Sequence, residues 1–215
     1  MKDTLPVMSG YLVLGAGFGM IMHANGYGIL WAAAMSFFIY AGSMQYAAVG
    51  LITGGASFLT VALTTVAVNA RHIFYGISMV EKYKGTGFRK PYMMFALTDE
   101  TYSLVCSSER DVNYYFFVSL FDQSYWIAGS ALGSVLGSAV KINTEGIDFV
   151  LTALFVTIFI EQWLSSKKHF SAVAGVVITA VCLAVFGAES FLIPSMLIIA
   201  AVLLAGYKKG AALYE

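Results

Sequence analysis

Long apolar stretches, separated by short polar ones, run through almost the whole chain. A bilayer core about 30 Å thick is crossed by about 20 mostly apolar helical residues. The pattern therefore predicts an all-α bundle of about seven membrane spans, at 6–24, 29–52, 56–80, 113–140, 148–164, 171–187 and 190–207. These stretches leave no room for a separate soluble domain, so we expect one integral membrane domain over residues 1–215.

A shorter apolar stretch, 92–105, has the adjacent acids Asp99 and Glu100 at its centre. It is too short and too charged for a free-standing span, and is better suited to a re-entrant or half helix buried against protein. Lysine and arginine cluster in loops that we expect to be cytoplasmic. If 92–105 does not cross, these clusters predict an extracytoplasmic N-terminus and a cytoplasmic C-terminus; the clusters are Lys82 to Lys90, Lys167–Lys168 and Lys208–Lys209.

Two glycine-rich segments resemble each other. The segment 10–19 is followed by Gln45, and the segment 126–137 is followed at similar spacing by Gln162. On the predicted topology they run in opposite directions, which suggests an inverted repeat of the kind found in secondary transporters. Glycines four residues apart in both segments also predict close helix packing, either within the chain or with a partner chain.

Composition narrows the function. The chain is 59% hydrophobic and only 11% charged, against roughly 25% charged in soluble domains. Its net charge of zero gives no basic surface for nucleic acid. Cys106 and Cys182 form no disulfide framework or metal motif, and no hydrolase, metalloprotease or P-loop motif occurs, so we expect neither an enzyme nor a bound cofactor or metal.

Polar groups inside apolar stretches are the candidates for function. A charged group at the centre of a span costs about 2.5–3.5 kcal/mol even on mild scales, so it marks a functional site by default. Four such clusters occur, at Tyr40 to Tyr46, Asn69 to His72, Thr98 to Tyr102 and Asp122 to Ser124.

These residue types suit a small zwitterion. Arg71 can hold a carboxylate in a bidentate fork, and Asp99 or Glu100 can face an ammonium group or carry a proton. Neutral contacts would come from Asn69 and from a broken helix around Gly42, with Ser43 and Gln45, and His72 is a candidate proton relay. Alternatively, Arg71 and the acids only neutralise one another between packed helices, or Arg71 reaches an interface.

Six segments together resemble the AzlC/YgaZ family, the large subunit of branched-chain amino acid exporters linked to azaleucine resistance. They are GYLVLGAGFG (10–19), SFFIYAGSMQYAAVGL (36–51), VNARHIFYG (68–76), LTDETY (97–102) and the pair at 126–137 and 146–155. The resemblance spans residues from about 8 to 160, and the order of its AGS-x-Q, N-x-R-H-x-x-Y-G and T-D-E motifs makes it specific.

The resemblance implies a multi-pass protein of the bacterial plasma membrane that exports branched-chain or other small apolar amino acids, coupled to the proton gradient. It also implies a small hydrophobic partner of the AzlD/YgaH type. Gly42, Ser43, Gln45, Asn69, Arg71, His72, Asp99 and Glu100 match the family's motifs. Two alternatives remain open: a membrane scaffold whose polar pairs only specify packing, and a channel or permease for another small solute.

Overall fold

The computed structural model describes residues 2–106, 108–139, 156, 159–160, 163–164, 169–187 and 191–209. Helices make up all the regular secondary structure in these ranges, which confirms the all-α prediction for them. The chain divides into two compact units, Met1–Leu151 and Thr152–Glu215. Most of the predicted 148–164 span lies outside the described residues.

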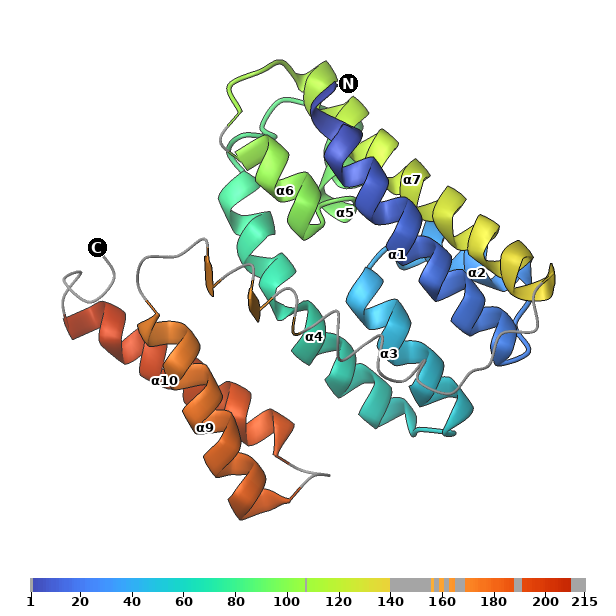
Figure 1. The fold of residues 1–215 in the computed structure, drawn as a ribbon. Coiled ribbons are helices and arrows are strands. Elements are labelled where there is room, and N and C mark those ends of the chain that lie inside the picture. Colours follow the sequence, from blue (N-terminus) through green and yellow to red (C-terminus); the bar gives the residue numbers. More distant parts are fainter. Residues whose placement is uncertain are drawn as a thin grey trace. The chain divides into compact units, whose positions relative to one another are not determined.

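The first unit carries the polar clusters at Tyr40, Asn69, Asp99 and Asp122. Its elements are η1 (Lys2–Thr4), α1 (Leu5–Ala24), α2 (Ile29–Phe38), α3 (Gly42–Thr53), α4 (Phe58–Met79), α5 (Arg89–Phe95), α6 (Asp99–Cys106) and α7 (Val112–Ala139) (Figure 1). In the second unit, α9 (Phe170–Phe186) packs on α10 (Leu192–Lys209).

Apolar side chains cover much of the outer surface. Along α4 the exposed fractions range from 40% to 96% for Phe58, Leu59, Leu63, Val66, Ile73, Phe74 and Ile77. Such an extended apolar face suits lipid rather than water. By length and composition, the stretch Lys2–Ala24 is the one in the described ranges that meets the criteria for a span, so the predicted number of seven is not established.

The closest helix contact joins α1 to α7 and depends on glycine. A Cβ on Gly15 would lie 3.0 Å from the Trp126 carbonyl oxygen, and one on Gly129 would lie 2.7 Å from the Tyr11 carbonyl oxygen. Gly133 is pressed against the backbone of Ala16. The predicted small-residue packing surface is therefore confirmed as a contact within the chain, and only glycine lets the two backbones come this close.

The register of this contact shows that α1 and α7 run in the same direction. Gly15 lies against Trp126 and Gly129, and further along both helices Gly137 lies against His23. Figure 1 shows the two helices side by side over most of their length. Segments 10–19 and 126–137 are therefore parallel, so the inverted repeat predicted between them is wrong.

The predicted 29–52 span is broken in the middle. Helix α2 ends at Phe38, Tyr40 adopts a positive φ of 43°, and α3 begins at Gly42. The break lies level with the middle of α7, because Gln123 donates to the Phe37 carbonyl over 3.0 Å. This break confirms the expected interruption around Gly42. However, α3 turns back instead of continuing across the membrane as the predicted 29–52 span would.

A fully buried glutamine holds this break against α7. The Gln45 Oε1 accepts a hydrogen bond from Trp126 Nε1 over 2.9 Å, and its Nε2 donates to the Ser36 hydroxyl over 3.2 Å. Ser36 in turn donates to Ser130 over 2.8 Å. A Cβ at Gly42 would meet the Trp126 ring at 3.0 Å, so the start of α3 also needs glycine.

The expected short, non-crossing piece at 92–105 is observed as two short helices, α5 and α6. Helix α5 lies alongside α7, since Arg89 forms a hydrogen bond with Asn113 and Tyr92 forms one with Gln123. The chain breaks at 96–98, and α6 then returns along α4 in matched register. Three hydrogen bonds mark this register, Tyr75–Asp99, Ser78–Tyr102 and Lys82–Cys106.

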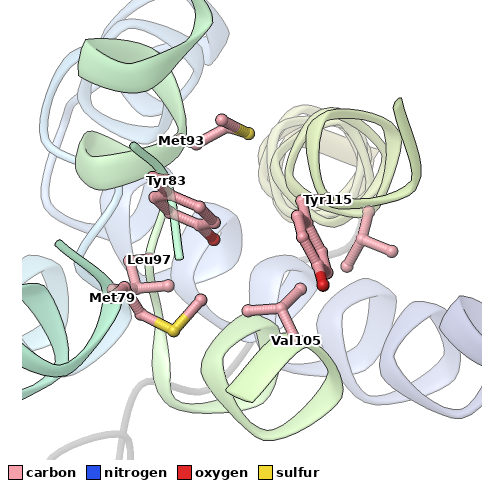
Figure 2. Packing of buried hydrophobic residues seen from close by; sticks show 7 residues of the cluster. Met79, Tyr83, Met93, Leu97, Val105 and Tyr115 are labelled. Carbon is pink, nitrogen blue, oxygen red and sulfur yellow. The ribbon is translucent and has the colours of Figure 1, made fainter. Parts of the chain in front are cut away.

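An apolar cluster closes the end of the first unit at which α4 finishes. Met79, Tyr83, Met93, Leu97, Val105, Tyr115 and Val118 pack together from α4, the loop after it, α5, α6 and α7 (Figure 2). Tyr83, Met93 and Val105 are fully buried, and burial of an apolar side chain such as Met93 or Val105 contributes about 1.5–3 kcal/mol relative to its exposure to water. This cluster holds α5 and α6 in place between the longer helices.

The N-terminus lies at the same end of the unit. Asp3 pairs with Arg110 at 3.6 Å and accepts a hydrogen bond from Tyr114, while Arg89 bonds to Asn113 on the same turn of α7. The basic cluster Lys82 to Lys90 and the N-terminus therefore share one side, so the predicted placement on opposite sides is wrong. The error comes from counting 29–52 as a crossing.

We expect Gly19→Ala to destabilise the α1–α7 contact. A Cβ at residue 19 would lie 2.6 Å from the Ser134 nitrogen, and overpacking of this kind costs about 1–3 kcal/mol. Gly10→Ala on the same helix is the matched control, because nothing lies within 4 Å of its Cβ position. Thermal unfolding in detergent should show a lower Tm for G19A alone; equal Tm values would contradict the close contact.

A double-mutant cycle tests the buried glutamine. Gln45→Leu leaves the Trp126 Nε1 hydrogen without an acceptor, at a cost of about 1–3 kcal/mol. Trp126→Phe removes the N–H donor itself, so the double variant leaves no donor without an acceptor. Its loss in the free energy of unfolding should therefore be smaller than the sum of the two single losses. Additive effects on the free energy of unfolding would show that the two side chains do not interact.

Candidate functional site

Polar residues gather where the two helix breaks meet. Tyr40 in the first break lies 6.4 Å, ring to ring, from Phe95 at the end of α5. From this region α3 and α6 both begin, so two helix N-termini lie close to the polar clusters. At α6 the Thr98 hydroxyl accepts a hydrogen bond from the Thr101 backbone N–H over 3.3 Å.

Arg71 on α4 is the centre of the first polar group. Its Nη1 pairs with Asp99 Oδ2 at 2.9 Å, and its Nη2 donates to the Ser43 hydroxyl over 3.2 Å. The two charged side chains remain 28% and 31% exposed. The buried Nε has no hydrogen-bond partner in the described part of the chain. The pair is thus accessible, and the guanidinium keeps donor capacity for another ligand.

One neighbour on α4, Tyr75, orients this pair, and a second, His72, lies beside it. Tyr75, one turn after Arg71, donates to Asp99 Oδ1 over 2.6 Å, so both carboxylate oxygens are engaged. Tyr75 also stacks on Tyr102 with ring centroids 4.5 Å apart. The His72 ring lies 5.9 Å from that of Tyr75, beside the ion pair but not hydrogen-bonded to it in the described ranges.

Glu100 faces a different helix from its neighbour Asp99. Its Oε2 forms a hydrogen bond with the Tyr11 hydroxyl of α1 over 2.7 Å. Tyr11 also contacts the Thr98 hydroxyl at 2.6 Å. Successive helical residues point about 100° apart, so the first turn of α6 presents one acid to α4 and the next to α1.

The structure brings together Ser43, Arg71 and Asp99, with His72 beside them and Glu100 on the other side of α6. Gly42 and Gln45 are committed to packing against Trp126. Asn69, two residues before Arg71, projects from another face of α4, since residues at i and i+2 do not face each other. Their predicted contacts to a substrate stay predictions.

Sequence reasoning gave no role to four residues that the structure places at the site, although two of them, Thr98 and Thr101, lie in the cluster Thr98 to Tyr102. Tyr11, Tyr75, Thr98 and Thr101 all bond to, or within one step of, an acidic side chain. Asp122 was singled out as an intramembrane acid but given no role; it is fully buried and accepts from Thr101 over 2.8 Å. A hydroxyl on an apolar helix carries little sequence signal, because tyrosine and threonine are also common packing residues.

A hollow of about 210 Å³ lies elsewhere, at the N-terminal end of α7. It is lined by Thr4, Tyr114, Phe117, Val118 and Phe121. Neither Arg71 nor Asp99 borders it. This hollow is therefore not a space between Arg71 and the acids.

Comparison with known proteins places the chain in a family. The family model described as "AzlC protein" matches residues 6–140. The chain is 45% identical over 205 residues to the "Branched-chain amino acid transport protein AzlC" of Bacillus subtilis (strain 168), covering 93% of this chain and 81% of the relative.

More distant relatives are named as membrane proteins. An "Uncharacterized membrane protein" of Helicobacter pylori (strain ATCC 700392 / 26695) is 41% identical, with 91% of this chain and 88% of the relative covered. The "Inner membrane protein YgaZ" of Escherichia coli (strain K12) is 26% identical, with 75% and 71% covered. No solved structure matches the chain significantly. The matched region contains α1 to α7 with both helix breaks and the Arg71–Asp99 pair, and the chain belongs to the AzlC family of membrane proteins.

Proposed function

We propose that this protein transports small apolar amino acids, the branched-chain ones first, across the bacterial plasma membrane, and that Arg71 and Asp99 form the substrate site. The observation that carries the proposal is the partly exposed Arg71–Asp99 ion pair at the meeting point of two broken helices. The name of the Bacillus subtilis relative supports the substrate class.

An amino acid carries both charges of the ion pair, so it can serve as the anionic partner of Arg71 and as the cationic partner of Asp99. Its carboxylate takes the place of Asp99 on the Arg71 fork, and its ammonium group takes the place of Arg71 on Asp99. When a substrate binds, one ion pair opens and two new ones form. While no substrate is present, the Arg71–Asp99 pair keeps both charges compensated. Ser43 and the free Nε of Arg71 supply further hydrogen bonds.

The half helix α3 adds a second site for the carboxylate. Its first residues, Gly42 and Ser43, lie next to Arg71, and the first N–H groups of a helix attract anions. Broken helices whose N-termini face an anionic substrate are a recurrent feature of secondary transporters. Asn69 and Gln45 remain candidates for neutral contacts.

Charge distribution supports an orientation with the N-terminus in the cytoplasm. The end of the first unit that carries the N-terminus also carries six basic residues, Lys2, Lys82, Lys84, Arg89, Lys90 and Arg110. The described loops at its other end, 25–28 and 54–57, contain no lysine or arginine. This asymmetry follows the positive-inside rule.

The finer parts of the proposal follow the family resemblance. Transport is outward, coupled to protons through Glu100 with His72 nearby, in a multi-pass protein that works with a small hydrophobic subunit of the AzlD/YgaH type. The competing role is a scaffold in which the Arg71–Asp99 pair only joins α4 to α6.

Removing one charge of the Arg71–Asp99 pair distinguishes the transporter role from the scaffold role. Arg71→Gln removes a charge-assisted contact to the substrate worth about 1.5–3 kcal/mol, so leucine binding should weaken roughly ten- to a hundredfold. The measurement is efflux of labelled leucine from proteoliposomes that contain this chain with and without its small partner. Glu81→Gln, at an exposed surface pair with Lys84, is the matched control and should transport normally.

The double variant R71Q/D99N gives a second test that distinguishes a transporter from a scaffold. Both charges are then absent, so a scaffold should recover the Tm and assembly lost by R71Q, whereas a transporter should still fail to move leucine. Recovery of efflux together with stability would overturn the proposed substrate site.

A further inference from the structure

A continuous chain of oxygen atoms joins Glu100 to Asp122 through three hydroxyl groups. Glu100 contacts Tyr11 at 2.7 Å, Tyr11 contacts Thr98 at 2.6 Å, Thr98 contacts Thr101 at 3.1 Å, and Thr101 contacts Asp122 at 2.8 Å. Tyr11 is 4% exposed, Thr98 9%, and Thr101 and Asp122 are fully buried. The chain thus connects two acids on different helices without reaching water between them.

Counting hydrogen atoms shows that this chain needs one more proton than its hydroxyls supply. Each hydroxyl carries one hydrogen, so Tyr11, Thr98 and Thr101 provide three for four contacts. An ionised carboxylate provides none. If both acids were ionised, one of these four contacts between oxygen atoms would have no hydrogen in it.

The geometry assigns the missing proton to Glu100. Thr98 is oriented to donate to Thr101, and Thr101 to donate to Asp122. Thr98 has then used its only hydrogen, so the 2.6 Å contact with Tyr11 requires Tyr11 as the donor. With the Tyr11 hydrogen directed to Thr98, the 2.7 Å contact between Tyr11 and Glu100 contains a hydrogen only when Glu100 is protonated and donates.

The surroundings of the two acids fit one shared charge. The ion pairs seen in the described ranges involve Arg71, Lys84 and Arg110, and none includes Glu100 or Asp122. The second oxygen of Asp122, Oδ1, is buried and has no hydrogen-bond partner in the same ranges. A second ionised carboxylate connected to the fully buried Asp122 would be costly, and one proton between the two acids lowers the cost.

Other ionisable groups lie around the chain. Glu100 is influenced by its neighbour Asp99 and by Arg71 on α4, and Asp122 interacts with Tyr40 in the first helix break and with Tyr92 on α5. Arg71 is the cation of this set, and it is engaged by Asp99.

We propose that Glu100 and Asp122 hold one proton in common, and that the hydroxyls of Tyr11, Thr98 and Thr101 form the path by which it passes between them. In one transfer, Glu100 gives its proton to Tyr11, each hydroxyl passes its own hydrogen to the next, and Thr101 gives its hydrogen to Asp122. The result is an ionised Glu100, a protonated Asp122 and a reversed hydrogen-bond direction, with every hydroxyl intact.

The proposal deepens the proposed function, because it supplies a proton carrier next to the substrate pair, but its first test needs no transport. Infrared spectra of the purified protein at neutral pH should contain the carbonyl band of one protonated carboxylic acid. Glu100→Gln and Asp122→Asn should each abolish it, because the new amide N–H supplies the fourth hydrogen. Glu109→Gln, at an exposed glutamate, should retain it.

A wild-type spectrum without this band, or a band that survives in both E100Q and D122N, would overturn the shared proton. This result is independent of whether the chain transports amino acids. Failure of R71Q to affect leucine efflux would instead count against the proposed substrate site while leaving the infrared result intact.

The path is tested with an isosteric pair of variants. Thr101→Val removes the hydroxyl and keeps the side-chain shape, so proteoliposomes should lose leucine-dependent proton movement down to the level of protein-free liposomes. Thr101→Ser restores a hydroxyl and should restore the movement, while binding of leucine stays close to wild type in both. Proton movement by T101V at the wild-type rate would exclude the path.

Discussion

The structure depends on how a broken helix can be held within apolar surroundings. A break leaves backbone N–H and C=O groups without partners, and lipid offers none, so the protein must supply them. Here α2/α3 and α5/α6 both break at the level of the middle of α7, where Gln123 reaches the Phe37 carbonyl and Gln45 ties α3 to Trp126. The close α1–α7 contact provides the firm surface against which both breaks rest.

Apolar length predicted the long helices well, since α1, α4, α7, α9 and α10 match the expected stretches to within a few residues. It could not distinguish a span from two half helices that turn back, because the polar cluster at Tyr40 to Tyr46 predicts a break in 29–52 but not the direction that the backbone takes after Tyr40. That single miscount reversed the expected side of the N-terminus. The direction of α1 relative to α7 was equally invisible, since glycine spacing specifies closeness and not polarity.

The candidate site was predictable where charge was involved. Arg71, Asp99 and Glu100 stand out in an apolar chain, and the structure does join Arg71 to Asp99. Sequence proximity was misleading for Glu100, because its place beside Asp99 suggested a common partner and the helix sends the two acids to different neighbours. The hydroxyl groups were beyond prediction, since whether a tyrosine or threonine packs or bonds is decided by tertiary contacts.

The first turn of α6 therefore makes contacts on two sides, because its two acids point to different helices. On one side it is tied to α4 through Asp99, Tyr75 and the register that continues to Lys82, and on the other it meets α1 and α7 through Glu100, Thr98 and Thr101. The contacts of its polar residues with α1 and α7 are the same hydrogen bonds that would carry the proton. Protonation and helix packing at this point therefore cannot change independently, and an amino acid that draws Asp99 away from Arg71 alters the charge one residue from Glu100. Coupling between solute and proton then requires no long-range signal, only the rigidity of a single helical turn.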